Sequence, residues 1–419
     1  TGEAIIELMK KINQELSRLS ASRKALEEYI DERKDLAHYE SVNISMEPGA
    51  DGHVLALTGW LPARREKALV QFIERFPAWY SLDEPGREDQ IPVVLRNKPG
   101  VRLFEPITKI FQLPDYFELD PTAAIAPFFA IFFGNCLGDA GYGLVILVLA
   151  TIARVKLKGA GKAVAALGQI LGLATVVMGL VNTGVVFGKT ISENLDVPGF
   201  ELLNQLVLIR EGVMMNPFNF ALLLGVTQMN IGMVLNIYSN LRYNSFKNAL
   251  PGLGRILLVD GCILLFLILY QEMEALQPLL AFAGAGVGIG FAVLVYVAFF
   301  TELEQYLGNP IADLVLKLYF VLSGAVGDVL SYIRLFALGL SSGVLGYVVN
   351  VIALQIRDAI PVVGWILFVV FLVAGHAGNL VLAALGSFVH PLRLTFVEFY
   401  NNLVFKGGGV EYRPFKKTT

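Results

Sequence analysis

Apolar residues fill most of the chain after residue 121, in long runs separated by short polar stretches. The runs cover residues 122–153, 163–187, 217–239, 253–271, 278–300, 326–356 and 362–402. A helix needs about 20 predominantly apolar residues to cross a bilayer. The first run is too long for one ordinary crossing, and its segment GNCLGDAGYG predicts two short helices joined by a tight turn that carries Asp139. The pattern therefore predicts a mainly α-helical, polytopic membrane domain of about eight spans, the last two long and tilted.

Residues 1–41 carry a different pattern, in which apolar positions alternate at spacings of four and three. The seam consists of Ile5, Met9, Ile12, Leu16, Leu19, Leu26 and Ile30. This spacing is typical of one helix of a coiled coil. No second seam of this kind follows, so we expect the partner helix to be missing or to belong to another subunit, with a single surface helix as the alternative. The chain begins in the middle of this pattern, and we therefore expect it to be an N-terminally truncated product or a fragment.

Residues 42–121 predict a small α/β lobe that ends in an interfacial segment. His53–Trp60 alternates as a strand does, and Pro62 stands where a helix can begin. Further extended pieces are expected near Trp79–Leu82 and Pro92–Leu95. Residues 101–120 mix aromatic, charged and proline residues, which is typical of a segment at the membrane surface. A transmembrane domain at 122–406 and a polar tail at 407–419 complete the expected division of the chain.

Composition and loop charge agree with this organisation. Charged residues are 16% of the chain and hydrophobic residues 55%, whereas a soluble domain carries about a quarter charged residues. Basic residues gather after alternate spans: Arg154, Lys156, Lys158 and Lys162 after the second, Arg242, Lys247 and Arg255 after the fourth, and Lys406, Arg413, Lys416 and Lys417 after the eighth. By the positive-inside rule these loops, the N-terminal lobe and the C-terminus are cytoplasmic. Residues 302–325 are less apolar and predict an amphipathic helix along the cytoplasmic surface.

Several classes of site are not expected. Cys136 and Cys262 form neither a metal-ligand spacing nor a disulfide framework. The segment Gly184–Thr190 imitates a phosphate-binding loop but has three residues between its glycines where four are required. The glycines of AGAGVGIG at 283–290 fit close helix packing better than nucleotide binding. We therefore expect no cofactor, no metal and no nucleic-acid partner, and any ATP to be bound by another chain.

Arg334 is the only formal charge in the apolar stretch from Val329 to Leu354. A guanidinium remains protonated, and burying one at bilayer depth costs about 2.5 kcal/mol or more. Ser331 and other small residues share its side of the predicted helix and would let another helix approach it. The alternatives are an arginine that snorkels to the headgroups and a fixed positive charge that faces an ion path.

The last apolar run carries a second polar face. His376, Asn379, Ala383, Gly386, His390, Arg393 and Val397 follow one another at steps of three and four, with Ser387 and Glu398 beside them. Pro391 removes a backbone donor and is expected to bend this helix. A single membrane histidine is often a packing residue, whereas a row that ends in a second arginine favours a hydrated ion path.

At these residues the sequence resembles a known family. SYIRLFALGL around Arg334 and HPLRLTFVEFYNNLVF around Arg393 resemble the last two spans of the membrane stator subunit of rotary V-type and A-type ATPases, called subunit a or subunit I. PTAAIAPFFAIFFGNCLGDAGYG resembles the beginning of that family's membrane domain, and TGWLPARREKALVQFIE resembles its cytoplasmic lobe.

The resemblance implies a non-catalytic subunit that couples proton or sodium translocation to ATP hydrolysis or synthesis. It implies that Arg334 meets the carboxylates of a rotating ring of small hydrophobic subunits, and that Arg393 is the family's second arginine. His390 and Asp139 match positions around the non-cytoplasmic half-channel, and Glu398 matches an acidic position near the cytoplasmic end. Residues 1–41 would belong to a peripheral arm that contacts peripheral-stalk subunits and the soluble ATPase sector. A self-contained secondary transporter or channel and a structural anchor are the alternative functions.

Overall fold

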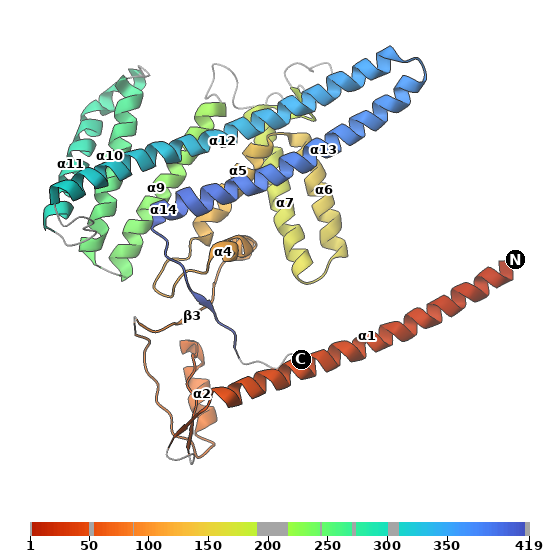
Figure 1. Cartoon of the computed structure of the whole chain (residues 1–419), viewed down its shortest axis with the longest axis horizontal. Coiled ribbons are helices and arrows are strands. Elements are labelled where there is room, and N and C mark those ends of the chain that lie inside the picture. Colours follow the sequence, from red (N-terminus) through yellow and green to blue (C-terminus); the bar gives the residue numbers. More distant parts are fainter. Residues whose placement is uncertain are drawn as a thin grey trace. The chain divides into compact units, whose positions relative to one another are not determined.

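The computed structural model describes residues 2–49, 54–86, 88–190, 217–243, 245–269, 274–300 and 310–414, which are mainly helical. The chain divides into two compact units, one of Thr1–Val94 with Val410–Thr419 and the other of Leu95–Gly409 (Figure 1). Residues of the expected interfacial segment thus belong to the same unit as the apolar helices. The four-part division expected from the sequence remains a prediction.

The smaller unit begins with α1 (Gly2–Ser45), one uninterrupted helix where the heptad pattern predicts it. The antiparallel pair β1 (Glu47–Gly49) and β2 (Val54–Ala56) follows, so the strand expected from His53 is short. As expected, a helical segment begins at Pro62, which caps the 3-10 turn η2 (Ala63–Arg65) before α2 (Glu66–Ile73). The strand β3 (Pro92–Val93) pairs in parallel with β6 (Val410–Glu411), which joins the C-terminal segment to this unit.

The larger unit is a helical bundle (Figure 1). Its α-helices are α3 (Pro99–Arg102), α4 (Glu105–Phe111), α5 (Thr122–Leu137), α6 (Ala140–Lys156), α7 (Ala160–Met178), α9 (Pro217–Tyr243), α10 (Phe246–Leu269), α11 (Leu280–Phe300), α12 (Pro310–Ala359), α13 (Val363–Arg393) and α14 (Tyr400–Leu403). Shorter elements are the π-helical turns η3 (Gly179–Thr183) and η6 (Leu394–Phe399), the 3-10 turn η5 (Glu274–Leu279), and the hairpin of β4 (Val185–Val186) and β5 (Lys189–Thr190).

Among the described residues, six helical segments are long and apolar enough to cross a membrane. They are Ala160–Thr183, Pro217–Tyr243, Phe246–Leu269, Gln277–Val297, Leu314–Ala359 and Val363–Leu403, and α5 is a shorter apolar helix. The chain is therefore an integral membrane protein with several spans. The count of eight spans remains a prediction.

The break predicted within GNCLGDAGYG is confirmed. Helix α5 ends at Leu137, and Gly138 adopts the left-handed conformation, with φ of 60°, that glycine tolerates best. Asp139 then caps α6, because its side chain accepts hydrogen bonds from the backbone N–H groups of Gly141 and Tyr142. The loop at 190–212, which is expected outside the membrane, lies from residue 191 onward outside the described residues.

Two boundaries differ from those expected. The amphipathic helix expected at 302–325 is not a separate element, because residues 310–325 are continuous with the span in α12; residues 301–309 lie outside the described residues. No proline follows Pro310 in this stretch, so the helix propagates without a break. The sequence predicts a loop position for Arg255, whereas α10 already begins at Phe246 and Arg255 lies within it.

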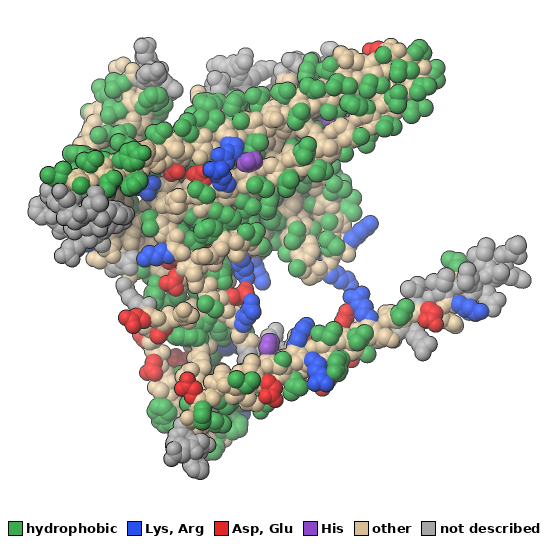
Figure 2. All heavy atoms as spheres, in the orientation of Figure 1, with side chains coloured by type: hydrophobic (Ala, Val, Ile, Leu, Met, Phe, Trp, Pro, Cys, Tyr) green, Lys and Arg blue, Asp and Glu red, His purple; other side chains and the backbone are tan. Residues whose placement is uncertain are grey.

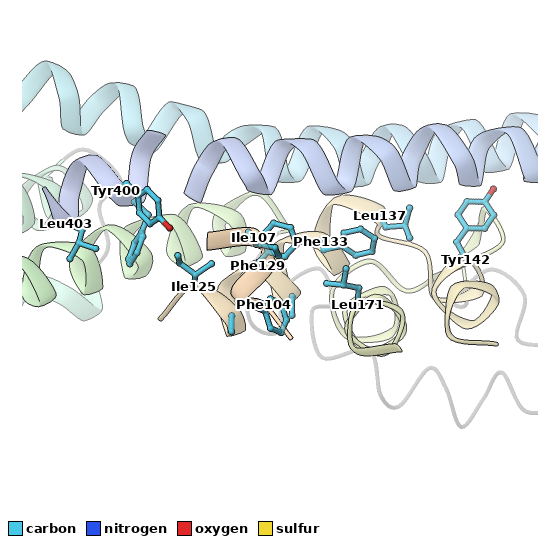
Figure 3. Close-up of a cluster of buried hydrophobic side chains, with 13 residues drawn as sticks. Phe104, Ile107, Ile125, Phe129, Phe133, Leu137, Tyr142, Leu171, Tyr400 and Leu403 are labelled. Atoms are coloured by element: carbon cyan, nitrogen blue, oxygen red, sulfur yellow. The ribbon is translucent and has the colours of Figure 1, made fainter. Parts of the chain in front are cut away.

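The core of the larger unit lies where the interfacial segment meets the first membrane helices (Figure 3). Phe104 and Ile107 of this segment pack with Phe129 and Phe133 of α5, and Leu171 of α7 and Tyr400 of α14 extend the same cluster. Two of the four glycines at 283–290 pack against α10 as expected: a Cβ on Gly290 would lie 2.6 Å from the backbone nitrogen of Leu258, and one on Gly286 would lie 3.4 Å from the carbonyl oxygen of Leu257. Close helix packing therefore accounts for these two positions, whereas Gly284 and Gly288 face open space.

Candidate functional site

The site is built on α12 and α13, which run side by side in opposite directions across α5 and α9 (Figure 1). One stripe of α12 is buried against the bundle: Ala325, Tyr332, Leu335, Gly339, Ser342, Gly346 and Ala353. The opposite stripe is exposed or partly exposed: Leu330, Arg334, Ala337, Ser341, Val344 and Val348. Both stripes step by three, four or seven residues, as the faces of one helix must. The rotation of α12 thus turns Arg334 away from the bundle, onto an apolar outer face.

Arg334, His390 and Arg393 form the first of three polar groups. Arg334 and His390 are half-buried and Arg393 is exposed, and both guanidinium groups interact electrostatically with His390. Figure 2 shows blue Lys and Arg side chains beside a purple His among green hydrophobic side chains over α12 and α13. Within the described part of the chain, none of the three has a hydrogen-bond or ion-pair partner. The outer face therefore presents positive charge without a matching carboxylate from those residues.

The second group surrounds Glu398, which lies in η6 and is only 2% exposed. The side-chain amide of Asn402 bridges two elements, because it donates to the Asp328 carboxylate at 2.8 Å and to the Glu398 carbonyl at 2.7 Å. Asp328 and Glu398 interact electrostatically. One turn further along α12, the Tyr332 hydroxyl donates to Gln228 of α9 at 2.8 Å.

Sequence reasoning missed the partners of Glu398. Asp328 is an acidic residue in the same apolar helix as Arg334, six positions before it. An acidic residue directly before the apolar stretch that begins at Val329 was a usable signal. Gln228 and Asn402 carried no comparable signal, because single amides in apolar helices are common packing residues.

The third group is centred on Asp139, which is fully buried. Its carboxylate accepts four backbone N–H groups: Gly141 at 2.8 Å, Tyr142 at 3.1 Å, Phe187 at 2.9 Å and Gly188 at 2.8 Å. The first two donors belong to the N-terminus of α6, and the other two form the turn of the β4–β5 hairpin. Four converging N–H donors form charge-assisted hydrogen bonds that partly offset the cost of burying this carboxylate.

His376 joins this third group. Its Nδ1 atom lies 2.7 Å from the Tyr142 hydroxyl, and its Nε2 atom lies 3.1 Å from the side-chain oxygen of Asn350. The Asn379 amide donates to the Tyr142 hydroxyl at 2.9 Å and to the Ser342 carbonyl at 3.0 Å. The network therefore ties α6, α12 and α13 together through neutral polar side chains.

The polar face expected along α13 is thus divided between separate groups. His376 and His390 are 14 residues apart, which is about 21 Å along a helix. His390 and Arg393 lie beside Arg334, whereas His376 lies with Asp139 and Glu398 lies beyond Pro391 with Asp328. Ser387 is buried with no hydrogen-bond partner for its hydroxyl within the described part of the chain, and Ser331 is half-buried one turn before Leu335.

No metal site accompanies these groups: within the described ranges, no set of three or more His, Cys, Asp or Glu side chains gathers closely enough. The segment Gly184–Thr190, which imitates a phosphate loop, folds as the β4–β5 hairpin. Its backbone N–H groups at Phe187 and Gly188 are already bound to Asp139.

Comparison with known proteins gives a consistent result. Residues 310–417 match the model of the V-type ATPase 116kDa subunit family. The A-type ATP synthase subunit I of Methanocaldococcus jannaschii is 29% identical over 453 residues, which cover 98% of this chain and 64% of that protein. Its counterpart from Archaeoglobus fulgidus is 30% identical over 438 residues, covering 93% and 62%. The V-type ATP synthase subunit I of Borreliella burgdorferi is 24% identical over 429 residues, covering 97% and 67%.

The chain thus spans somewhat less than two thirds of the length of these archaeal relatives. The match to the family model covers both helices that carry Arg334 and Arg393, and the similarity to the relatives extends over nearly the whole chain. Together with the multi-span helical unit, these similarities support a subunit of the a/I type of V-type and A-type ATPases.

Proposed function

We propose that this chain is the stator subunit of a rotary ATPase membrane sector, in which it forms two ion half-channels against a rotating ring of carboxylates. In this role it couples proton or sodium translocation to ATP hydrolysis or synthesis and is itself non-catalytic. The observation that carries the proposal is the position of Arg334. It lies on the outer face of α12, among exposed apolar side chains and without a counter-charge among the described residues.

The electrostatics of this face suit a rotor carboxylate. A permanent cation opposite a carboxylate favours the ionised form of that carboxylate. A ring carboxylate that reaches Arg334 would therefore release its ion on one side of the arginine and take up another after passing it. The guanidinium also opposes a direct leak of cations between the half-channels, because it repels them.

We assign the two half-channels to different polar groups. His390 and Arg393 lie beside Arg334, and His376 continues the same helix toward the α12–α13 connection; these residues would line the non-cytoplasmic half-channel. Glu398, with Asp328, would border the cytoplasmic one. Ser331 and Ser387 are small polar residues that would admit water along α12 and α13.

The proposed partners follow from the two units. The exposed apolar face around Arg334 would contact a ring of small hydrophobic rotor subunits, and lipid would cover the remaining apolar surface. Helix α1, with its heptad seam, would pair with a second helix in a peripheral arm and so reach the peripheral stalk and the soluble ATPase sector. The N-terminal lobe and the C-terminus would be cytoplasmic.

The test is ATP-driven ion pumping by the assembled complex in vesicles. Arg334→Ala should abolish coupled pumping while subunit content remains normal, because Arg334 lies on the outer face of α12 and makes no hydrogen bond or ion pair with the described part of the chain. Arg334→Lys should fail nearly as completely, since a compact ammonium lacks the planar fork of the guanidinium. Arg242→Ala, at the exposed end of α9, is the matched control and should pump normally.

Two results would contradict the proposal. One is near-normal coupled pumping by a fully assembled Arg334→Ala complex. The other is ion transport by the purified chain alone in liposomes, which a secondary transporter or channel would perform and a stator subunit without its ring would not.

A further inference from the structure

The β4–β5 hairpin lies between the α5–α6 turn and α12, and both sides hold it. The hairpin is short: a two-residue turn, Phe187–Gly188, joins β4 to β5. Both turn residues have positive φ, 48° for Phe187 and 71° for Gly188. Positive φ is rare for a bulky residue such as phenylalanine, and it persists only where the surroundings impose it.

Asp139 is the first of the groups that hold Phe187 and Gly188 at positive φ. Its two carboxylate oxygens accept the N–H groups of Phe187 and Gly188 as well as those at the start of α6. One side chain therefore fixes the hairpin turn to the N-terminus of α6. The ring of Phe187 fits over Gly141, where a Cβ would lie 2.6 Å from the ring. The same ring packs edge-on against Tyr142 at 5.9 Å and His376 at 6.0 Å.

Helix α12 holds the hairpin from the other side. The Asn350 side-chain amide donates to the Phe187 carbonyl at 2.7 Å. Gly188 and Gly346 meet backbone to backbone, and a Cβ on Gly188 would lie 2.2 Å from the carbonyl carbon of Gly346. Seven residues earlier on α12, a Cβ on Gly339 would lie 2.5 Å from the carbonyl oxygen of Asn135 in α5. Two backbone contacts on one stripe of α12 leave it little freedom to slide or rotate.

We propose that Asp139 is a positioning residue rather than a member of the ion path: through the β4–β5 hairpin it fixes the rotation of α12, and hence the direction of Arg334. The inference rests on the proposed role of Arg334 opposite a rotor. The hairpin meets α12 at Gly346, twelve residues and about 18 Å along the helix from Arg334, and Gly339, which packs against α5, lies between them. A rigid helix held at both glycines transmits the constraint to Arg334.

The geometry of Asp139 favours a clamp, that is, a side chain that holds the hairpin in place, over a relay that passes ions. An ion relay has to exchange its proton with water, yet Asp139 is fully buried and four backbone donors surround its oxygens. Protonation would place an O–H group among N–H donors and remove at least one of these bonds. The geometry therefore suits a carboxylate that stays in place and keeps all four hydrogen bonds.

A disulfide that replaces the clamp distinguishes the two roles. In a chain with Cys136→Ala and Cys262→Ser, the pair Val185→Cys and Gly343→Cys would join the hairpin to α12. A Cβ on Gly343 would meet only the methyl carbons of Val185, each at 4.0 Å, so the two positions face each other with room for two thiols between them. Neither residue belongs to the proposed ion path, so the pair should pump normally in either redox state when Asp139 is present.

Asp139→Asn should then lower ATP-driven pumping by the assembled complex by about tenfold or more, because a displacement of about 1 Å can cost about a hundredfold in rate. The side-chain amide would direct an N–H group at N–H donors and release the hairpin. In the double-cysteine chain, oxidation should restore pumping to Asp139→Asn, and dithiothreitol should remove it again. Crosslinking at a fixed oxidant concentration should also be slower with Asp139→Asn than with Asp139.

Each contrary result overturns the inference. Pumping that remains low after complete crosslinking would assign Asp139 to the ion path. Equal crosslinking rates with and without Asp139→Asn would mean that Asp139 does not hold the hairpin, and normal pumping by Asp139→Asn would make the clamp dispensable. The crosslinking rate does not depend on a rotor, so it still reports on the clamp if Arg334→Ala disproves the stator role.

A milder variant serves if Asp139→Asn prevents assembly. Asn350→Leu removes the bond from α12 to the Phe187 carbonyl and the contact with His376, and leaves the Asp139 bonds intact; His376→Gln serves as the control for the second effect. Asn350→Leu should lower pumping less than Asp139→Asn, and the oxidised cysteine pair should restore the loss. A loss that crosslinking does not restore would argue against positioning by the hairpin.

Discussion

At the scale of single residues, the buried acidic groups differ in how many hydrogen-bond donors surround them. Asp139 has four N–H donors, whereas one carboxylate oxygen of Glu398 has no hydrogen-bond partner in the part of the chain that the structure describes. A buried carboxyl that is not compensated lowers stability and is retained where it has a task. Glu398 is therefore the residue at which stability and function should respond in opposite directions.

We expect Glu398→Gln to leave the melting temperature of the purified complex unchanged or raise it, since the variant removes an uncompensated buried acid. ATP-driven pumping should fall about tenfold or more, which corresponds to about 1.4 kcal/mol or more. Thermal unfolding and vesicle pumping measure the two effects, with Glu411→Gln in the exposed C-terminal segment as the control. A variant that loses stability but pumps normally would assign Glu398 to packing.

At the scale of elements, close helix pairs depend on glycine at a few positions. In α11 the two faces differ sharply: a Cβ on Gly290 would meet the backbone of Leu258, whereas a Cβ on Gly288 has no neighbour within 4 Å. Gly290→Leu should therefore force α10 and α11 apart and lower the free energy of unfolding by about 1–3 kcal/mol. Gly288→Leu, two residues away, should have little effect. Thermal unfolding in detergent compares the pair, and equal melting temperatures would contradict the observed packing.

At the scale of the whole molecule, the arrangement of spans has a testable orientation. In the larger unit, the α6–α7 connection near Lys158 and the α12–α13 connection at Val362 lie at opposite ends of the helical bundle (Figure 1). Both residues are exposed. The basic residues around Lys158 indicate the cytoplasmic side. In a chain without its native cysteines, a membrane-impermeant maleimide added outside intact cells should label Val362→Cys and should label Lys158→Cys only after permeabilisation. The reverse pattern would invert the proposed topology.

The sequence by itself determined the elements and their chemistry. Runs of apolar residues specify membrane helices because lipid cannot hydrogen-bond an unsatisfied backbone. GNCLGDAGYG specifies a turn because Gly138 can take a positive φ and Asp139 can cap the next helix. The heptad seam of α1 and the isolated charge of Arg334 are equally local features. Each of these features depends on residues that lie within a few positions of one another, so the sequence alone is enough to identify it.

Only the tertiary structure decided which polar residues act together. His376 and His390 share a helix face in the sequence pattern, yet the hairpin and Tyr142 draw His376 into the group of Asp139 and leave His390 beside Arg334 and Arg393. Asp328 and Asn402 are 74 residues apart and meet at 2.8 Å. Periodicity assigns a residue to a face of its own helix, but the neighbour of that face depends on the packing of α12 and α13 against the rest of the bundle. That packing depends on backbone contacts such as Gly188 with Gly346, which join residues too distant in sequence for any local pattern to record.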